Sequence, residues 1–299
     1  LSANTRPAAS PNSTSSLASS PNARDTRSTT HARASSNVNA ISHLQCIPYT
    51  ENSMSLHQLS LTEMSRLRAR NKISASELLE AHLTQIERVA PSLNPFTALY
   101  ADQARAQAAA PRPGKLSGIP VTLKDSFDLA GEPTHCGSRL RLGHRASRDS
   151  APAARLRAEG AIILAKTNTP EFLAHYESDN HLTGRTNNPW NPSRTAGGSS
   201  GGEAAAIASF CSPGGVGSDG GGSVRWPAHA CGIAALKPTP GRVPATGHWP
   251  LIHHPGGLLG VAGPMARSAA DLRLLFEVLA LHDPLDPFSA PVPPLSFPT

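Results

Sequence analysis

The sequence predicts an α/β fold, with helices on both sides of a mixed, mostly parallel sheet. Two short runs, GIPVTLKD at residues 118–125 and AIILAK at residues 161–166, are apolar and rich in β-branched side chains, as buried strands are. Around them lie segments with helical spacing and helix-capping residues. Strands that alternate with helices along a chain favour a parallel or mixed sheet covered by those helices.

The first ordered segments predict helices. Residues 56–70 are expected to form a short helix. Ser74 and Glu77 have the spacing of a capping box, and the apolar residues that follow are spaced for a helix over residues 75–90. Residues 104–110 are expected to extend a further helix.

The later elements continue the alternation. Ser150 is the expected N-cap of a helix that has Pro152 in its first turn and stops at Gly160. The other expected elements are a helix at 203–210, a strand at 215–219, a helix after Ser223, a strand at 233–238 and a helix at 269–280 capped by Ser268.

Both ends of the chain differ in composition from its middle. Residues 1–54 are expected to form a disordered arm, because the first 50 contain four arginines, Asp25 as the only acid and no sustained apolar period. An arginine- and serine-rich arm also resembles an organelle transit segment, an alternative ranked below a disordered extension. Residues 284–299 carry six prolines and predict a tail without regular structure, which leaves one ordered domain at 55–283.

Composition excludes several classes of function. The net charge of +6 owes about half its excess to the arm, and the rest has no basic run, so we expect no direct nucleic-acid binding. No apolar stretch reaches membrane-spanning length. Cys46, Cys136, Cys211 and Cys231 lack C-x-x-C spacing, which disfavours a zinc site and indicates small buried thiols in a reducing, cytoplasmic compartment.

The glycine- and serine-rich centre of the chain matches a short hydrolase motif. Gly197, Ser199 and Gly201 fit G-x-S-x-G, the nucleophile elbow of α/β-hydrolases. That elbow follows a strand directly, whereas NNPWNPSRTA precedes it here and reads as a loop. His253 and His254 lie in a predicted loop outside any triad-like motif, so a histidine base is not indicated.

A second motif in the same region suggests a dinucleotide site. Gly215, Gly217 and Gly220 fit G-x-G-x-x-G, which needs an acidic residue about 20 positions later to bind a ribose. After Asp219 the next acid is Asp271, so we reject this interpretation.

The segment DGGGS at residues 219–223 suits a nucleophilic serine. Such a serine needs a base, donors for the oxyanion and room for the substrate. Glycines at a helix start leave the approach open, and their N–H groups converge where the helix dipole favours negative charge. The alternative is a tight glycine turn with an ordinary N-cap serine.

The whole pattern resembles the amidase signature family of serine hydrolases. This family includes fatty-acid amide hydrolases, bacterial amidases and the A subunit of the tRNA-dependent amidotransferase. The matching segments occur in the family's order within about residues 56–280: GIPVTLKDSFDLAG, GAIILAKTNTPEF, NNPWNPSRTAGGSSGGEAAAIAS, GVGSDGGGSVRWPA and CGIAALKPTPGRVP. Family members are considerably longer, so the resemblance covers their catalytic half and implies an incomplete amidase signature domain.

The resemblance implies a Ser–Ser–Lys triad. By position in the matching segments, Lys124 is the base, Ser199 is the relay serine with an unusual cis peptide bond, and Ser223 is the nucleophile. Ser200 is implied as a supporting neighbour of the relay.

The resemblance also implies roles for the residues of the glycine loop. The oxyanion hole is expected to consist of the backbone N–H groups of Gly220, Gly221, Gly222 and Ser223. Asp219 and Arg225 match positions that hold this loop in place.

A lysine base imposes a physical condition. A free lysine has a pKa of about 10.4 and must be neutral to accept a proton. Burial can lower the pKa of a lysine by about 3–5 units. Lys124 ends a predicted buried strand, which is a suitable place for such a shift.

The implied function is hydrolysis of the C–N bond of a small-molecule amide through an acyl-Ser223 intermediate, with no metal or organic cofactor. One alternative is the A subunit of a glutamine-dependent tRNA amidotransferase, which supplies ammonia; the apolar, aromatic loop at 247–257 places it second. Another is an inactive fragment that acts as an interaction module. The sequence is also compatible with a homodimer.

Overall fold

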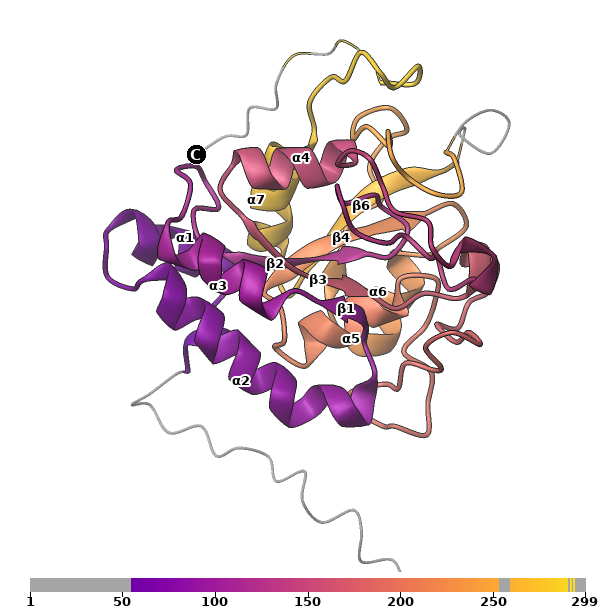
Figure 1. The fold of residues 1–299 in the computed structure, drawn as a ribbon, viewed down its shortest axis with the longest axis horizontal. Helices are drawn as coiled ribbons and strands as arrows, with labels where there is room; N and C mark the ends of the chain where they lie inside the picture. The colour runs from indigo at the N-terminus through magenta and orange to yellow at the C-terminus, as the bar shows by residue number, and fades with distance from the viewer. Residues whose placement is uncertain (1–54, 253–258, 290, 292, 294–299) are drawn as a thin grey trace, which may run out of the picture. The chain divides into compact units, whose positions relative to one another are not determined.

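The fold was analysed in a computed structural model that describes residues 55–252, 259–289, 291 and 293. The predicted disordered arm at 1–54 lies outside these residues, as does most of the predicted tail. The described residues form one open sheet with helices packed on both of its faces (Figure 1).

The sheet has six strands in the order β1-β3-β2-β4-β6-β5. Their bounds are β1 Phe96–Leu99, β2 Pro120–Lys124, β3 Ile162–Thr167, β4 Gly214–Asp219, β5 Ala234–Ala235 and β6 Val261–Ala266. Strand β2 pairs in parallel with β3 and with β4, while β1, β6 and β5 pair antiparallel with their neighbours. A mixed sheet is therefore confirmed.

The expected mixed, mostly parallel sheet is present in the direction of its strands, since β2, β3, β4 and β5 run one way and β1 and β6 run the other. The three central strands, which are the ones that the sequence predicted most clearly, form its two parallel pairings. The sequence missed β1 and β6, and both run antiparallel to the neighbours they join. The predicted strand at 233–238 shortens to the two residues of β5 at the sheet edge.

The described helices agree in most places with the sequence. Their bounds are α1 Leu61–Ala69, α2 Ala75–Leu93, α3 Ala101–Ala109, α4 Ala151–Ala158, α5 Gly201–Ala208, α6 Arg225–Cys231 and α7 Ala269–Leu279, with 3-10 turns η1 Leu56–Gln58, η2 Arg139–Arg141 and η3 Glu171–Leu173. The predicted capping box of α2 is present, with Ser74 and Glu77 bonded reciprocally.

Helices α3 and α5 each begin two or three residues before their predicted starts, and two other differences from the predicted helix boundaries have a clear local cause. The single helix expected at 56–70 is split into η1 and α1, because the Ser60 hydroxyl accepts a hydrogen bond from the Glu63 N–H and caps a new helix start. Helix α2 continues past Pro91 to Leu93 and stops where Asn94 adopts a left-handed conformation with φ 51°.

The core lies on both faces of the sheet. Side chains of α1, α4 and α7 pack on one face against Val121, Leu123 and Val216. On the other face, α2 and α3 pack against Ile162 and Leu164, and the alanine-rich α5 and α6 pack near β6. Helices on both sides of the sheet, as predicted, are confirmed.

The parallel strands place three chain positions at one edge of the sheet. Lys124, Thr167 and Asp219 are the last residues of β2, β3 and β4. Because the carboxyl ends of parallel strands meet at the same edge, the loops that follow them are neighbours, which is where α/β proteins commonly build their sites.

Other features of the described chain bear on the predicted class. Cys136, Cys211 and Cys231 are free and buried, as expected of small core thiols. No helix in the part that the structure describes is both long and apolar enough to cross a bilayer. The described start of the predicted tail has no helix or strand, yet the carboxylate of Asp286 accepts a hydrogen bond from the Ala245 N–H at 2.8 Å.

Candidate active site

Lys124 is a fully buried lysine whose nitrogen faces hydroxyl groups. Its side chain has no solvent exposure. Nζ donates to Oγ of Ser199 at 2.7 Å and to Oγ of Ser218 at 3.0 Å, with the Ser218 carbonyl at 3.4 Å. Among the described residues, no carboxylate pairs with this ammonium group. The sequence did not single out Ser218, the second hydroxyl on the lysine.

This environment favours the neutral amine. Burial lowers the pKa of Lys124 from 10.5 to about 7, although the nearby Cys136, Asp219 and Glu203 act in the opposite direction. The uncharged form of Lys124 is therefore available near neutral pH, and its Nζ can exchange a proton with Ser199 over a single hydrogen bond.

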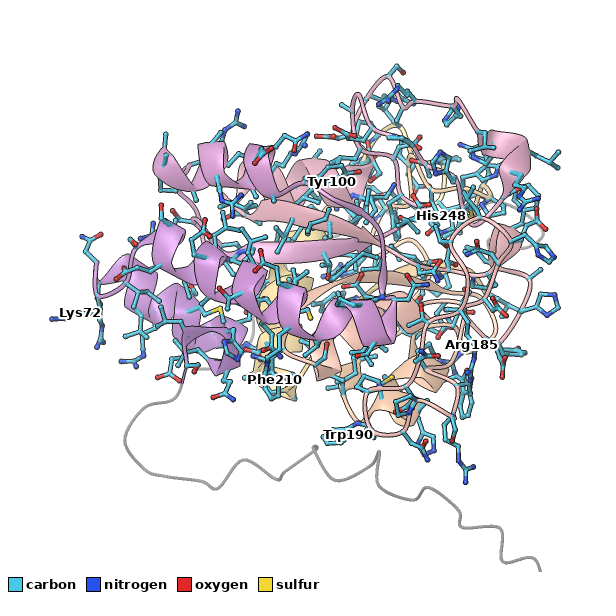
Figure 2. The ribbon with its side chains drawn as sticks, turned by 60° about the horizontal axis from the view of Figure 1, so that its bottom comes forward. Lys72, Tyr100, Arg185, Trp190, Phe210 and His248 are labelled. Carbon is cyan, nitrogen blue, oxygen red and sulfur yellow. The ribbon has the colours of Figure 1, made fainter. Side chains whose placement is uncertain are left out.

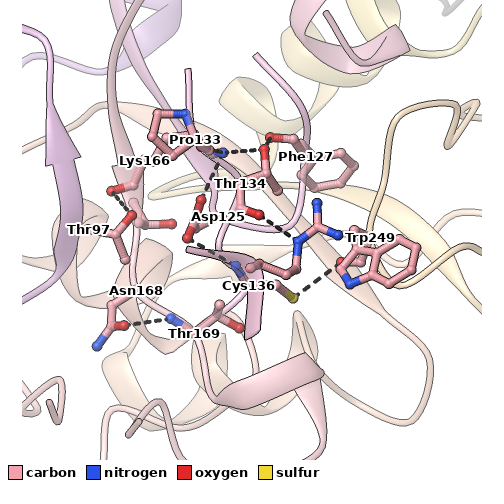
Figure 3. A network of polar contacts seen from close by, with 12 residues as sticks. Thr97, Asp125, Phe127, Pro133, Thr134, Cys136, Lys166, Asn168, Thr169 and Trp249 are labelled. Atoms are coloured by element: carbon pink, nitrogen blue, oxygen red, sulfur yellow. Dashed lines mark hydrogen bonds and ion pairs between the residues drawn. The ribbon is translucent and has the colours of Figure 1, made fainter. Parts of the chain in front are cut away.

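A second buried lysine shows what a structural ammonium looks like in the same sheet. Lys166 lies on β3, next to β2, and is also fully buried. Its Nζ forms an ion pair with Oδ1 of Asp125 at 2.9 Å and donates to the Pro133 carbonyl and the Thr134 hydroxyl, both at 3.2 Å (Figure 3). Lys166 thus has the carboxylate partner that Lys124 lacks.

Ser199 reaches Lys124 from the loop that leads into α5. The Gly198–Ser199 peptide bond is cis. The loop passes close to other backbone segments, since a Cβ on Gly198 would lie 2.6 Å from the Glu177 nitrogen. Among the described residues, Ser200 makes no hydrogen bond to Lys124, and its hydroxyl makes only long contacts to the Ser218 backbone, at 3.3 and 3.4 Å.

A buried carboxyl, that of Glu203, lies near enough to the lysine to interact with its charge. Glu203, on the first turn of α5, accepts hydrogen bonds from the hydroxyls of Thr122 and Thr167, the latter at 2.8 Å. Burial raises the pKa of Glu203 to about 7, while the two threonines and Lys124 oppose that rise. The group ties α5 to β2 and β3 and so holds the relay loop against the strand end.

Asp219 organises the glycine loop between β4 and α6. Its carboxylate accepts from the N–H groups of Gly222, Val224 and Arg225 and from the guanidinium of Arg225. Although burial alone would raise it, these hydrogen bonds lower the pKa of Asp219 to about 2. The loop is therefore held by a carboxylate that carries its charge at neutral pH.

Three N–H groups of this loop remain available. In the described part of the chain, those of Gly220, Gly221 and Ser223 have no acceptor, and all three residues line one cavity. The expectation for Gly222 differs from the structure, because its N–H is donated to Oδ1 of Asp219 at 2.7 Å. Gly222 has φ +122°, a conformation that glycine adopts readily, and this turn directs its N–H towards the carboxylate.

The cavity has a volume of about 300 Å³ and contains Ser199, Ser218 and Ser223 in its wall. The largely apolar residues of its wall are Phe172, Leu173, Ala174, Tyr176, Pro250 and Ile252. Ser223 is half-buried at the wall, and its carbonyl accepts from the Ser200 N–H at 3.2 Å, which links the two serine loops. Within the described residues the Ser223 hydroxyl makes no hydrogen bond to Ser199.

The structure thus brings Lys124, Ser199 and the glycine loop together around one cavity. It also places His248 in the cavity wall, a residue that no sequence pattern indicated. Among the described residues, no group of three or more histidine, cysteine or acidic side chains is arranged to hold a metal ion.

The fold and this site define a class of α/β protein in which a buried lysine is hydrogen-bonded to serines at the end of a parallel strand. The Amidase family profile matches residues 77–298. The chain therefore belongs to the Amidase family, and its described residues have the fold of the amidase signature enzymes.

Individual relatives support this assignment. The chain is 41% identical over 236 residues to an indoleacetamide hydrolase of Bradyrhizobium diazoefficiens, a match that covers 74% of this chain and 44% of the relative. It is 42% identical over 245 residues to the A subunit of the glutamyl-tRNA(Gln) amidotransferase of Chloroflexus aurantiacus, covering 79% and 50%.

Solved structures give the same result. A 6-aminohexanoate cyclic dimer hydrolase in complex with substrate superposes with a TM-score of 0.74 at 35% identity, over 80% of this chain and 50% of that one. A bacterial aryl acylamidase superposes with a TM-score of 0.74 at 34% identity, over 80% and 51%. The chain spans about half the length of the relatives it matches.

Proposed function

We propose that this protein is a serine amidohydrolase that cleaves a carboxylic amide through an acyl intermediate on Ser223. The observation that supports the proposal best is the environment of the buried Lys124. Its Nζ lies 2.7 Å from Oγ of Ser199, and among the described residues no carboxylate forms an ion pair with it. A lysine with a pKa of about 7 can act as a base near neutral pH.

In the first step, neutral Lys124 takes a proton from Ser199 as Ser199 takes one from Ser223. The Ser223 oxygen attacks the amide carbon and forms a tetrahedral oxyanion. The backbone N–H groups of Gly220, Gly221 and Ser223 stabilise that oxyanion. The three residues line the cavity, and these N–H groups make no hydrogen bond to any described residue.

In the second step, the C–N bond breaks. The Lys124 ammonium returns its proton through Ser199 to the leaving nitrogen, so that the amine departs neutral and the acyl group stays on Ser223. Water then attacks the acyl-enzyme by the same route and releases the acid. Every proton taken up by Lys124 is returned, and these steps use no metal or organic cofactor.

The substrate class follows from the cavity. The apolar residues of its wall suit an uncharged acyl group, and the relatives named above include an indoleacetamide hydrolase and an aryl acylamidase. We propose an uncharged small-molecule amide as substrate. The buried free thiols fit the cytoplasmic location that the sequence suggested.

A second function is favoured by the match to the amidotransferase of Chloroflexus aurantiacus. In that role the same site would hydrolyse glutamine and pass ammonia to a partner. Glutaminase activity that appears only when partner proteins are added would support this alternative over a free amidase.

Labelling of Ser223 tests the proposal. We expect a fluorophosphonate to add one adduct to the 299-residue chain, mapped to Ser223 by peptide mass spectrometry, and Ser223→Ala to give none. An adduct on another serine would contradict the assignment of the nucleophile, and absence of any adduct would favour a catalytically inactive chain.

A further inference from the structure

His248 is a buried histidine in the wall of the candidate active site. It is 3% exposed and lines the cavity together with Ser199, Ser218 and Ser223. Figure 2 places it among the loops at the end of the molecule opposite Lys72, which lies in the turn between α1 and α2.

Hydrogen bonding fixes the tautomer of this histidine. Nδ1 lies 2.6 Å from the Pro250 carbonyl, which can only accept, so Nδ1 carries the proton. Nε2 is then a lone-pair acceptor. Among the described residues this buried Nε2 has no hydrogen-bond partner. A buried acceptor without a hydrogen bond raises the free energy of the folded state. A bound ligand with an N–H or O–H group can supply the missing donor.

The ring is also held in place and held neutral. It packs edge-to-face on Phe127, with ring centroids 4.8 Å apart, and the two residues form an antiparallel bridge. Burial and the neighbouring Lys124 lower the pKa of His248 to about 3, against the hydrogen bond to Pro250. The ring therefore presents an acceptor, and no donor, at Nε2.

Its attachment places His248 on the lysine side of the cavity. The backbone N–H of Trp249 donates to the Ser126 carbonyl at 2.7 Å, and Ser126 and Phe127 lie two and three positions after Lys124 in the chain. The free glycine N–H groups lie on the other loop, after β4. The carbonyl oxygen of a bound amide accepts hydrogen bonds from those N–H groups. The nitrogen of the same amide then points towards the side of the cavity near Lys124.

The other buried polar side chains of the described cavity wall are already occupied. Ser199 and Ser218 accept from Lys124, and the carboxylate of Asp219 holds the glycine loop. Among the described buried side chains of this wall, His248 alone has a ring nitrogen with no hydrogen-bond partner, Nε2. An amide nitrogen carries N–H donors, whereas the alkoxy oxygen of an ester carries none.

We infer that His248 is a substrate-positioning residue, whose Nε2 accepts a hydrogen bond from the N–H of the substrate amide. This inference rests on the proposed amidase function and deepens it, because it names a residue that selects primary and secondary amides over esters. The bond orients the leaving nitrogen so that its lone pair faces the proton that returns through Ser199.

Binding to an acylation-deficient chain tests the inference without relying on turnover. In a Ser223→Ala background, the Kd of phenylacetamide and of methyl phenylacetate is measured by NMR titration, with and without a second change at His248. His248→Asn keeps a donor near the Nδ1 position and loses the acceptor at Nε2. His248→Gln can place its amide oxygen near Nε2 and serves as the matched rescue.

We expect His248→Asn to weaken phenylacetamide binding by about 3- to 10-fold, the effect of one lost hydrogen bond, and to leave ester binding unchanged. His248→Gln is expected to recover most of the amide affinity. Equal losses for amide and ester would show a purely structural role, and no loss for either, or no amide binding to the Ser223→Ala parent, would also overturn the inference. Fluorophosphonate labelling of the unmutated chain tests the proposed function separately.

Discussion

At the scale of single residues, the site depends on which buried lysine lacks a carboxylate. Lys166 and Lys124 lie on neighbouring strands and are equally buried. Asp125 forms an ion pair with Lys166, whereas among the described residues Lys124 contacts only oxygens of Ser199 and Ser218. Since a buried charge without an oppositely charged partner is unfavourable, Lys124 loses its proton more readily than an exposed lysine does. The neutral amine can then act as a base.

The two adjacent serines of the relay loop are expected to differ in their effect on catalysis. Ser199→Ala removes the hydroxyl that contacts Lys124 and should slow amide hydrolysis by about 10²- to 10⁴-fold, the usual contribution of a positioned proton-transfer group. Ser200→Ala removes only long contacts and should be much milder. Steady-state kinetics on one amide substrate decide the matter, and full activity in Ser199→Ala would exclude Ser199 as the relay.

The sequence could predict only part of the site at this scale. Lys124, Ser199 and Ser223 lie in recognisable segments, so their order along the chain was enough to select them. The exclusion of Gly222 from the free N–H groups depends on which way one peptide faces, and no sequence pattern encodes that. His248 is an isolated histidine whose unpaired Nε2 becomes visible only when the chain is folded.

At the scale of elements, the glycines of β4 allow α5 to approach the sheet. A Cβ on Gly215 would lie 2.0 Å from the Glu203 carboxylate and 2.3 Å from the Thr122 carbonyl, and a Cβ on Gly217 would lie 2.7 Å from the Ser200 hydroxyl. The absence of side chains on this face brings the relay loop within reach of Lys124.

Gly215→Ala is therefore expected to lower the free energy of unfolding by about 3 kcal/mol, at the upper end of the range for overpacking, because both neighbours are tightly held. Gly220→Ala is the matched control, since no atom of the described residues lies within 4 Å of its Cβ position, and it should change the free energy of unfolding by less than about 0.5 kcal/mol. Urea denaturation measures both. Equal stability of the two variants would contradict the packing of α5 on β4.

The elements themselves were unequally predictable. Strands β2 and β3 are continuous apolar runs, and the sequence located both. Strand β6 contains Gly263 and Pro264, residues that normally disfavour strands. Its conformation is explained by tertiary contacts, since a Cβ on Gly263 would lie 2.5 Å from the Leu236 carbonyl and the Pro264 carbonyl accepts from Leu236 N–H.

At the scale of the whole molecule, the lysine base costs stability. The folded pKa of Lys124 is about 7 and its ordinary value is 10.5, so the unfolded chain binds more protons between these two pH values. The free energy of unfolding of the protein therefore receives a contribution from Lys124 that rises with pH between pH 7 and pH 10.5. Below pH 7 the full penalty applies, about 5 kcal/mol for a shift of this size.

Lys124→Met should thus stabilise the fold while removing its chemistry. Loss of the donor to Ser199 and Ser218 costs about 1–3 kcal/mol, which leaves a net gain of about 2 kcal/mol at pH 7. The gain should decrease steadily from pH 7 towards pH 10. Denaturant unfolding of both proteins at several pH values measures it, and a pH-independent difference would show that Lys124 is charged in the fold.

The central claim, that Lys124 is the base that activates Ser223, is tested most directly by the pH dependence of acylation. The measurement is the rate of Ser223 labelling by a fluorophosphonate between pH 5 and pH 9, in the unmutated chain, Lys124→Met and Lys124→Arg. We predict that the unmutated rate rises through a single ionisation near pH 7, as the lysine loses its proton. Both variants should be slower by about 10²-fold or more and lack that ionisation, because neither methionine nor a permanently charged guanidinium can accept the proton. A near-normal rate with the same pH profile in Lys124→Arg would contradict the account and make Lys124 a structural cation.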